Sequence, residues 1–366
     1  MKGIFIMDKR TTYHEQTDME NILKLREVLK TLPVFARDYF RAIEATTTTK
    51  TRISYAYDIR IFFQFLIDEN PLFKDYSMDQ FTVDVLDQLK SVDIEEYMEY
   101  LKLYTDSDNQ VVTNGERGLK RKLSALRSFY SYFFKREAIR TNPTVLIDMP
   151  KIHDKAIIRL DVDEVALLLD YMENCGERLT GQRKVYYEKN KERDIAIVTL
   201  LLGTGIRVSE CVGLDVEDVD FKNNGIKVTR KGGNEMIIYF GPEVERALRN
   251  YLEVRDTITP VTGHEHALFY SAQRKRIGVK AVENLVKKYS REVTTTKKIT
   301  PHKLRSTYGT ALYHETGDIY LVADVLGHKD VNTTKKHYAA MDDARRRMAA
   351  SAVKLPFVVT TPVTRH

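Results

Sequence analysis

The stretch Ile299-Thr-Pro-His-Lys-Leu-Arg305 is the most informative part of this 366-residue chain for both fold and chemistry. Pro301 is suited to the first turn of an α-helix, so the stretch predicts that a helix begins here. In that helix His302 and Arg305 are three residues apart and share one face. A guanidinium and an imidazole held side by side suit an anionic ligand such as a phosphate group.

Two other segments carry side chains of matching chemistry. The upstream segment Thr204-Gly-Ile-Arg-Val-Ser-Glu210 places Arg207 just after a glycine turn, where a helix is expected to start. Glu210 lies one helical turn further on, and we expect it either to orient Arg207 or to be an exposed acid of that helix. The downstream segment Leu326-Gly-His328 supplies a second histidine, and Tyr338 follows it ten residues later.

A β-hairpin is predicted between the two arginines. Ile226 and Val228 alternate with polar residues, and apolar residues 236–240 form the returning strand. The sequence Lys231-Gly-Gly-Asn234 supplies the turn, so Lys231 is placed at the tip of the hairpin.

Each of these side chains alone has an ordinary structural explanation, and only their joint occurrence favours a catalytic site. Fixed cations are most effective where negative charge develops in a transition state, so the set suits phosphoryl transfer. The sequence shows neither an aspartate-rich metal cluster nor a GxxxxGK[ST] phosphate loop, and therefore indicates neither a metal-dependent nuclease nor an ATP-driven motor. Tyr338 is the candidate nucleophile.

With these motifs the sequence resembles the tyrosine recombinase family, which includes the phage integrases and Xer-like site-specific recombinases, over roughly residues 34–345. The ordered catalytic pattern of that family is Arg, Lys, His-x-x-Arg, His or Trp, and Tyr. It matches, in the same order, Arg207, Lys231, His302, Arg305, His328 and Tyr338.

The resemblance implies a chemical role for each of these residues. Tyr338 would attack the scissile phosphodiester and form a 3′-phosphotyrosyl bond, while Arg207 and Arg305 hold the non-bridging oxygens. His302 and His328 would assist through hydrogen bonding and proton handling. Lys231 would be the general acid for the leaving 5′-oxygen, and proton donation of this kind is worth about 10²–10⁴-fold. No cofactor and no metal is implied, because the energy of the broken bond is conserved in the phosphotyrosyl link.

The resemblance also implies a mainly α fold, the DNA breaking-rejoining fold. A helical core-binding (SAM-like) domain precedes a mainly helical catalytic domain with a small antiparallel β-sheet. The expected boundaries are a 1–32 N-terminal extension, a 33–148 core-binding domain, a 149–160 linker, a 161–340 catalytic domain and a 341–366 tail. Within the extension a short helical arm is expected at Met19 to Leu32. The tail either docks on a neighbouring protomer or is a basic, phosphate-contacting end.

Two helices of the expected core-binding domain can be recognised from their apolar stripes. One begins after the threonine-rich residues 46–49 and carries Tyr55, Ile59, Phe62 and Leu66. The other carries Leu119, Leu123, Leu126, Tyr130 and Phe133. Its basic residues are expected to project away from that stripe and to face DNA phosphates; they are Lys120, Arg121, Lys122 and Arg127.

The catalytic domain is expected to open with a capped helix. Asp161-Val-Asp-Glu164 has the pattern of a capping box and precedes an apolar stripe. Residues 176–193 contain 6 bases and 3 acids without a clear period, and we expect a surface insertion there. His264 and His266 lack the neighbours of a metal site and are expected in a loop.

Composition fits a two-domain globular protein, with 43% hydrophobic and 30% charged residues. The net charge of +6 is unevenly spread, since residues 117–140 carry 8 bases and a single acid. Cys175 and Cys211 are too few for a disulfide framework, which favours a reducing compartment. With no signal-peptide pattern and no long apolar run, we expect a cytoplasmic protein with no membrane partner.

The expected partner is double-stranded DNA with inverted-repeat half-sites, bound by a homo-tetramer with possible accessory proteins. The biological outcome would be integration or excision of a mobile element, or Xer-type dimer resolution. Two alternatives remain open from the sequence. One is a type IB topoisomerase-like relaxing enzyme, which uses similar residues, and the other is a non-catalytic architectural DNA-binding protein.

Overall fold

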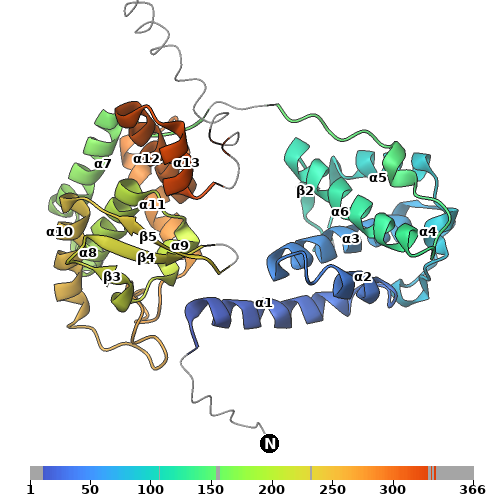
Figure 1. The fold of residues 1–366 in the computed structure, drawn as a ribbon, viewed down its shortest axis with the longest axis horizontal. Helices are drawn as coiled ribbons and strands as arrows, with labels where there is room; N and C mark the ends of the chain where they lie inside the picture. The colour runs from blue at the N-terminus through green and yellow to red at the C-terminus, as the bar shows by residue number, and fades with distance from the viewer. Residues whose placement is uncertain are drawn as a thin grey trace, which may run out of the picture. The chain divides into compact units, whose positions relative to one another are not determined.

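The computed structural model describes residues 11–106, 108–153, 157–230 and 233–328, together with Val331 and Thr334. The chain divides into two compact units, Met1–Lys155 and Ala156–His366. Both units are mainly helical with small antiparallel sheets (Figure 1), so the predicted fold class is confirmed. None of the described helices is long and apolar enough to cross a lipid bilayer.

The first unit is a helical bundle with one short β-hairpin. Its longer helices α3 and α6 pack against each other, and α1 packs along α3. In chain order its elements are α1 (Tyr13–Leu29), α2 (Ala36–Ala42), α3 (Thr49–Glu69), α4 (Val85–Gln88), α5 (Ser91–Tyr100), β1 (Leu103–Thr105), β2 (Val111–Thr113) and α6 (Glu116–Lys135).

Aromatic side chains form much of the core of this unit. Phe63 and Phe129 join α3 to α6 with their ring centroids 6.2 Å apart in an edge-to-face arrangement, a geometry that adds to the burial of apolar area. Both predicted apolar stripes are confirmed, since every member is buried except Tyr55 and Leu119, which are partly buried against the core. Thr48 caps the start of α3, as the threonine-rich stretch predicts.

Helix α1 is longer than the helical arm expected from the sequence. A capping box between Thr12 and Glu15 starts it at Tyr13. Leu25, Val28 and Leu32 are buried in the core of the first unit. Residues in the segment expected to precede the core-binding domain therefore contribute to the packing of that unit.

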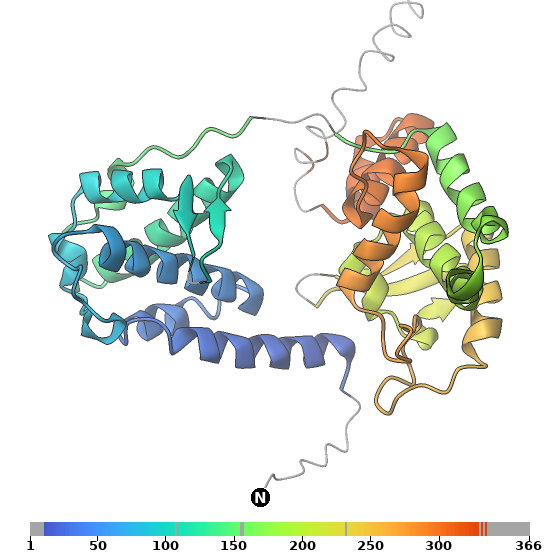
Figure 2. The same ribbon diagram turned by 180° about the vertical axis from the view of Figure 1, so that it is seen from behind.

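The second unit holds the catalytic candidates. Its elements are α7 (Val162–Asn174), α8 (Gly181–Thr204), α9 (Val208–Gly213), β3 (Val219–Asp220), β4 (Gly225–Thr229), β5 (Glu235–Tyr239), α10 (Pro242–Arg255), α11 (Val279–Val293), α12 (Pro301–Thr316) and α13 (Ile319–Leu326). The capping box predicted at Asp161 and Glu164 is present at the start of α7. Figure 2 shows α12 and α13, in orange to red, from the opposite side.

Helix α8 is the centre of the second unit and packs against α10 and α12. Residues 196–201 are buried on all sides, as is typical of a core helix. The structure differs from the surface insertion expected for residues 176–193, because most of them form the first half of α8. This half is anchored by Tyr187, which is buried and donates its hydroxyl hydrogen to Met172 O at 2.8 Å.

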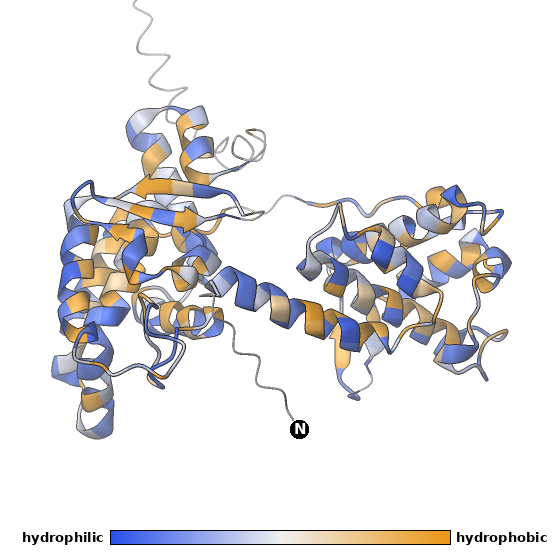
Figure 3. Ribbon diagram, turned by 60° about the horizontal axis from the view of Figure 1, so that its bottom comes forward, coloured by the Kyte–Doolittle hydropathy of each residue, from blue (hydrophilic) through white to orange (hydrophobic). Residues whose placement is uncertain are grey.

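The predicted β-hairpin is confirmed as β4 and β5, with Ile226 opposite Ile238 and Val228 opposite Met236. Strand β3 pairs with the other edge of β4, which gives the three-stranded order β3-β4-β5. The hairpin strands carry both hydrophobic and polar residues (Figure 3). The alternation places Ile226, Val228 and Ile238 in the core.

Candidate active site

The first part of the site is the start of α9. Gly205 ends α8 with a left-handed φ of +63°. A Cβ at Gly205 would lie 2.3 Å from Tyr308 Cδ1, so the turn needs glycine for its conformation and for space. Arg207 is the N-cap residue of α9. The turn at Gly205 thus places Arg207 at the N-terminus of α9.

Glu210 binds both ends of Arg207. Its Oε2 accepts a hydrogen bond from Arg207 N at 2.7 Å, and its Oε1 accepts one from Arg207 Nη1 at 2.7 Å. The Glu210 side chain is 3% exposed, whereas that of Arg207 is 36% exposed. Of the two expectations for Glu210, an exposed helix acid is therefore wrong, because the carboxylate is buried against the guanidinium.

Arg305 lies on the first turns of α12, which begins at Pro301 as the sequence predicts. Arg305 is 5% exposed. Its Nη1 donates to Gly205 O at 2.5 Å, and its Nη2 donates to Leu326 O. Arg305 therefore ties the end of α8 to the end of α13. His302, one turn earlier on the same helix, is exposed.

His328 directly follows the end of α13. Gly327 has a left-handed φ of +60° and forms the C-cap. His328 N then donates to Ala323 O at 2.9 Å. The ring atom His328 Nδ1 lies 2.7 Å from Thr334 Oγ1. This hydrogen bond fixes the orientation of the imidazole.

The C-terminal end of α13 brings these residues together. Arg207 Nη2 donates to Gly327 O at 3.3 Å. The last carbonyls of a helix have no donor within the helix and carry a partial negative charge. Together with the contact from Arg305 Nη2 to the adjacent Leu326 O, this places both predicted arginines and His328 at one helix end. The arrangement offers converging guanidiniums to an anion.

A third arginine at this helix end was not predicted from the sequence. Arg230 Nη2 donates to Val325 O at 2.7 Å. Its partner lies 95 residues further along the chain, so no local pattern could have indicated it. Lys231, which follows Arg230, and Tyr338 both lie outside the described residues, and their roles stay predictions.

Two other tyrosines of α12 and α13, Tyr308 and Tyr320, differ in how far their side chains are buried. Tyr308 packs against the buried pair Val322 and Leu326, and burial raises the pKa of its phenol. A raised pKa makes the phenolate nucleophile harder to form at neutral pH. Tyr320, on the first turns of α13, is 71% exposed.

The basic residues of α6 differ in how far they are committed to internal contacts. Lys122 is 5% exposed and its Nζ lies 3.0 Å from Asp58 Oδ1. The expectation that it projects away from the apolar face is therefore wrong. Arg121 also pairs with Asp58 but stays half exposed. Arg127 donates to the backbone oxygen atoms of Thr144 and Ile147.

Lys120 and Arg121 are the exposed members of this set. Contact of any of the four basic residues with DNA stays a prediction. Because Lys122 and Arg127 are bound by internal partners, Lys120 and Arg121 are the most accessible candidates.

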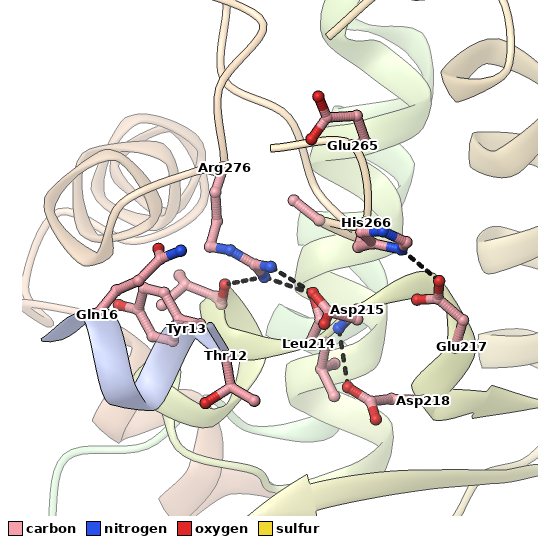
Figure 4. A network of polar contacts seen from close by, with 12 residues as sticks. Thr12, Tyr13, Gln16, Leu214, Asp215, Glu217, Asp218, Glu265, His266 and Arg276 are labelled. Atoms are coloured by element: carbon pink, nitrogen blue, oxygen red, sulfur yellow. Dashed lines mark hydrogen bonds and ion pairs between the residues drawn. The ribbon is translucent and has the colours of Figure 1, made fainter. Parts of the chain in front are cut away.

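A polar network supports the far end of α9 (Figure 4). Arg276 Nη1 donates to Leu214 O at 2.7 Å, and its Nη2 pairs with Asp215. His266 Nδ1 lies 2.5 Å from Glu217 Oε1. Within the part of the chain that the structure describes, no group of three or more histidine, cysteine or acidic side chains could hold a metal ion.

Comparison with known proteins gives consistent matches. A model of the Phage integrase family matches residues 158–345. Tyrosine recombinase XerC of Caldanaerobacter subterraneus subsp. tengcongensis is 33% identical over 339 residues, covering 90% of this chain and 89% of its own. Tyrosine recombinase XerS of Streptococcus thermophilus is 31% identical over 350 residues, covering 88% of this chain and 96% of its own.

Solved structures show a similar fold. The XerH site-specific recombinase bound to difH substrate, in a pre-cleavage complex, superposes with a TM-score of 0.61 at 18% identity, covering 94% of this chain and 90% of that one. The Tn1549 transposon integrase in complex with circular intermediate DNA gives 0.60 at 21% identity, covering 86% and 98%.

Proposed function

Since this chain belongs to the phage integrase family and is a tyrosine site-specific recombinase, we propose that Tyr338 is its nucleophile and that Arg207 and Arg305 hold the scissile phosphate. The observation that supports this proposal best is the convergence of both guanidiniums on the end of α13, next to His328. A bidentate cation is best suited to the paired non-bridging oxygens of a phosphodiester. Glu210 then acts as a positioning residue for Arg207.

The proposed reaction consists of two successive transesterifications at the same phosphorus atom. The phenol oxygen of Tyr338 attacks phosphorus, the bond to the 5′-oxygen breaks, and a 3′-phosphotyrosyl link forms. Lys231 gives its proton to the leaving 5′-oxygen. The 5′-hydroxyl of a partner duplex then attacks the phosphotyrosyl phosphorus, which restores a phosphodiester and returns the phenol. His302 and His328 assist by hydrogen bonding and proton handling.

The proposed assembly is a homo-tetramer on duplex DNA with inverted-repeat half-sites. The XerH and Tn1549 integrase structures contain DNA, as does a lambda integrase dimer on a COC′ core site. Residues 33–148 would be the core-binding domain, 149–160 the linker and 161–340 the catalytic domain. The tail 341–366, a candidate for exchange between protomers, lies outside the described residues. Accessory proteins and a cytoplasmic site of action belong to the same proposal.

A nicked suicide substrate tests the nucleophile. Cleavage next to the nick releases a short oligonucleotide, so religation fails and the covalent complex accumulates. We expect the parent protein to be trapped and Tyr338→Phe not to be. Tyr320→Phe, an exposed tyrosine on α13, is the matched control and should be trapped normally. Trapping of Tyr338→Phe would overturn the assignment.

A sulfur-substituted substrate tests the general acid. A 5′-bridging sulfur leaves as a thiolate without needing a proton, so Lys231→Ala should fail on normal DNA and recover on this substrate. No recovery would contradict the role of Lys231. The two alternative functions have their own signatures, since a topoisomerase would relax supercoils without a specific site and an architectural protein would bind without any covalent trapping.

A further inference from the structure

Arg230 has no role in the chemistry described so far, although its side chain reaches into the site. It directly follows strand β4 and donates from Nη2 to Val325 O at 2.7 Å. The guanidinium also lies against Gly327, because a Cβ built there would fall 1.1 Å from Arg230 Nη1. The absence of a side chain at Gly327 is therefore what admits Arg230.

The contact of Arg230 completes a regular pattern at the helix end. Three consecutive carbonyls, those of Val325, Leu326 and Gly327, each accept a hydrogen bond from a different arginine. The other two arginines are Arg207 and Arg305, which the proposed function assigns to the phosphate. Arg230 thus binds the third of these carbonyls, beside the two that Arg207 and Arg305 bind.

Placing a third guanidinium here is electrostatically unfavourable. Burial lowers the pKa of Arg230, Arg207 lowers it further, and Glu210 and Asp324 oppose both effects. Arg230 Nε is buried and makes no hydrogen bond to any described residue. A buried donor without an acceptor costs free energy. The hydrogen bond to Val325 O and the charges of Glu210 and Asp324 offset part of this cost.

The backbone of Arg230 closes the hairpin turn. Arg230 N donates to Asn234 O at 2.8 Å, and Gly233 N donates to Arg230 O at 3.0 Å. The turn that these two bonds close carries Lys231 as its next residue in sequence. Arg230 therefore belongs to the turn through its backbone and to the end of α13 through its side chain.

We infer that Arg230 is a positioning residue for Lys231, since it joins the base of the hairpin turn to the helix end where Arg207 and Arg305 lie. The inference rests on the proposed function, in which Lys231 protonates the leaving 5′-oxygen. A lysine on an unanchored turn samples many positions, and catalysis by proton donation requires the donor within hydrogen-bond reach of the leaving atom. Arg230, the residue before Lys231 in the sequence, fixes the start of the turn through its backbone and its side chain.

The test compares cleavage of normal and 5′-bridging sulfur substrates in single-turnover assays on a nicked cognate site. For Arg230→Gln we expect cleavage of normal DNA to fall about 10–10²-fold, part of the 10²–10⁴-fold available from a general acid. On the sulfur substrate the rate should return to within about threefold of the parent rate. Arg246→Gln, an exposed arginine of α10, is the matched control and should cleave both substrates normally.

Two outcomes would overturn the inference. One is a loss in Arg230→Gln of the same size on both substrates, which would mean that the variant damages phosphate binding or folding. The other is normal cleavage of the oxygen substrate. Thermal unfolding and cognate DNA binding are measured in parallel, and Arg230→Met, which keeps a long unbranched side chain but lacks the donor, replaces the Gln variant if that variant does not fold.

Lys231→Ala separates a failure of this inference from a failure of the proposed function. If sulfur does not rescue Lys231→Ala, the general-acid role itself is wrong. If sulfur rescues Lys231→Ala but not Arg230→Gln, Lys231 is the acid and Arg230 does not position it. Rescue of both variants supports both statements.

Discussion

Asp58 with Lys122 in the first unit and Glu210 with Arg207 in the second are both ion pairs around a buried carboxylate. The Asp58 side chain is 1% exposed and that of Glu210 is 3% exposed. The cations differ, because Lys122 is 5% exposed whereas Arg207 is 36% exposed. We call the Asp58–Lys122 pair closed, because its cation is also buried, and the Glu210–Arg207 pair open, because part of its cation is exposed.

Removing the acid of the closed pair should have the largest effect. We expect Asp58→Ala to lower the free energy of unfolding of the first unit by about 3–5 kcal/mol, because it leaves the Lys122 ammonium buried without its main partner. Urea unfolding followed by circular dichroism measures this. The double variant Asp58→Leu with Lys122→Met removes both charges and should recover most of the loss. A loss below about 1 kcal/mol in Asp58→Ala would show that the Lys122 ammonium does not depend on Asp58 as its buried partner.

Changing the cation of the open pair should act on catalysis. Arg207→Lys keeps the charge but cannot bind Glu210 and a phosphate with one planar fork. We expect strand cleavage to fall about 10²–10³-fold, the usual cost of losing a donor to transition-state charge. Single-turnover rates on a nicked site measure it, with cognate DNA affinity as the control. If affinity falls as much as the rate, Arg207 contributes to ground-state binding and the comparison with Lys122 is weakened.

Lys120 gives a smaller effect that tests accessibility. It is exposed, so Lys120→Gln should weaken DNA binding several-fold and reduce the slope of log affinity against log salt by about 0.9, the value for one lost phosphate contact. Lys122→Met is the matched control, because it removes a buried lysine whose Nζ is bound to Asp58 and leaves the Arg121–Asp58 pair in place, so the slope should stay unchanged. Fluorescence anisotropy titrations at several salt concentrations provide both slopes.

A third pair, exposed on both sides, should show the smallest effect. His153 Nδ1 lies 2.6 Å from Glu116 Oε1, and this hydrogen bond raises the pKa of His153. A raised histidine pKa means that the contact stabilises the fold below the ordinary pKa of 6.5 and is lost as pH rises through the raised value. In Glu116→Gln the pKa of His153 should fall back toward 6.5, which an NMR titration measures. The free energy of unfolding should hardly change, because both side chains are exposed. An unchanged His153 pKa would argue against the contact.

Much of the fold could be predicted because its signals are local. Apolar stripes, a capping box and alternating strand residues each occupy a short stretch, and they identified α3, α6, the start of α7 and the hairpin. The first half of α8 gave no such signal, since its residues are mostly exposed and only Tyr187, Asn190 and Arg193 are buried there. Without an apolar stripe, a solvated helix cannot be distinguished by period from a loop.

The candidate site shows the same limit. Lys122 could have been recognised, because it lies three residues after Leu119 and four before Leu126, on the apolar stripe itself. A basic residue there needs a buried acid, and Asp58 supplies it. Arg230 could not have been recognised, since its acceptor is brought to it by folding across 95 residues.

The three arginines at the end of α13 also have a consequence for the order in which the second unit forms. Their donors come from residues 207, 230 and 305, while the carbonyls that accept them are at 325–327. Contacts across such separations close large loops and tend to form late in folding. During synthesis, Arg207 and Arg230 emerge from the ribosome long before the helix end that gathers them. The candidate site is thus completed only when nearly the whole unit has been made.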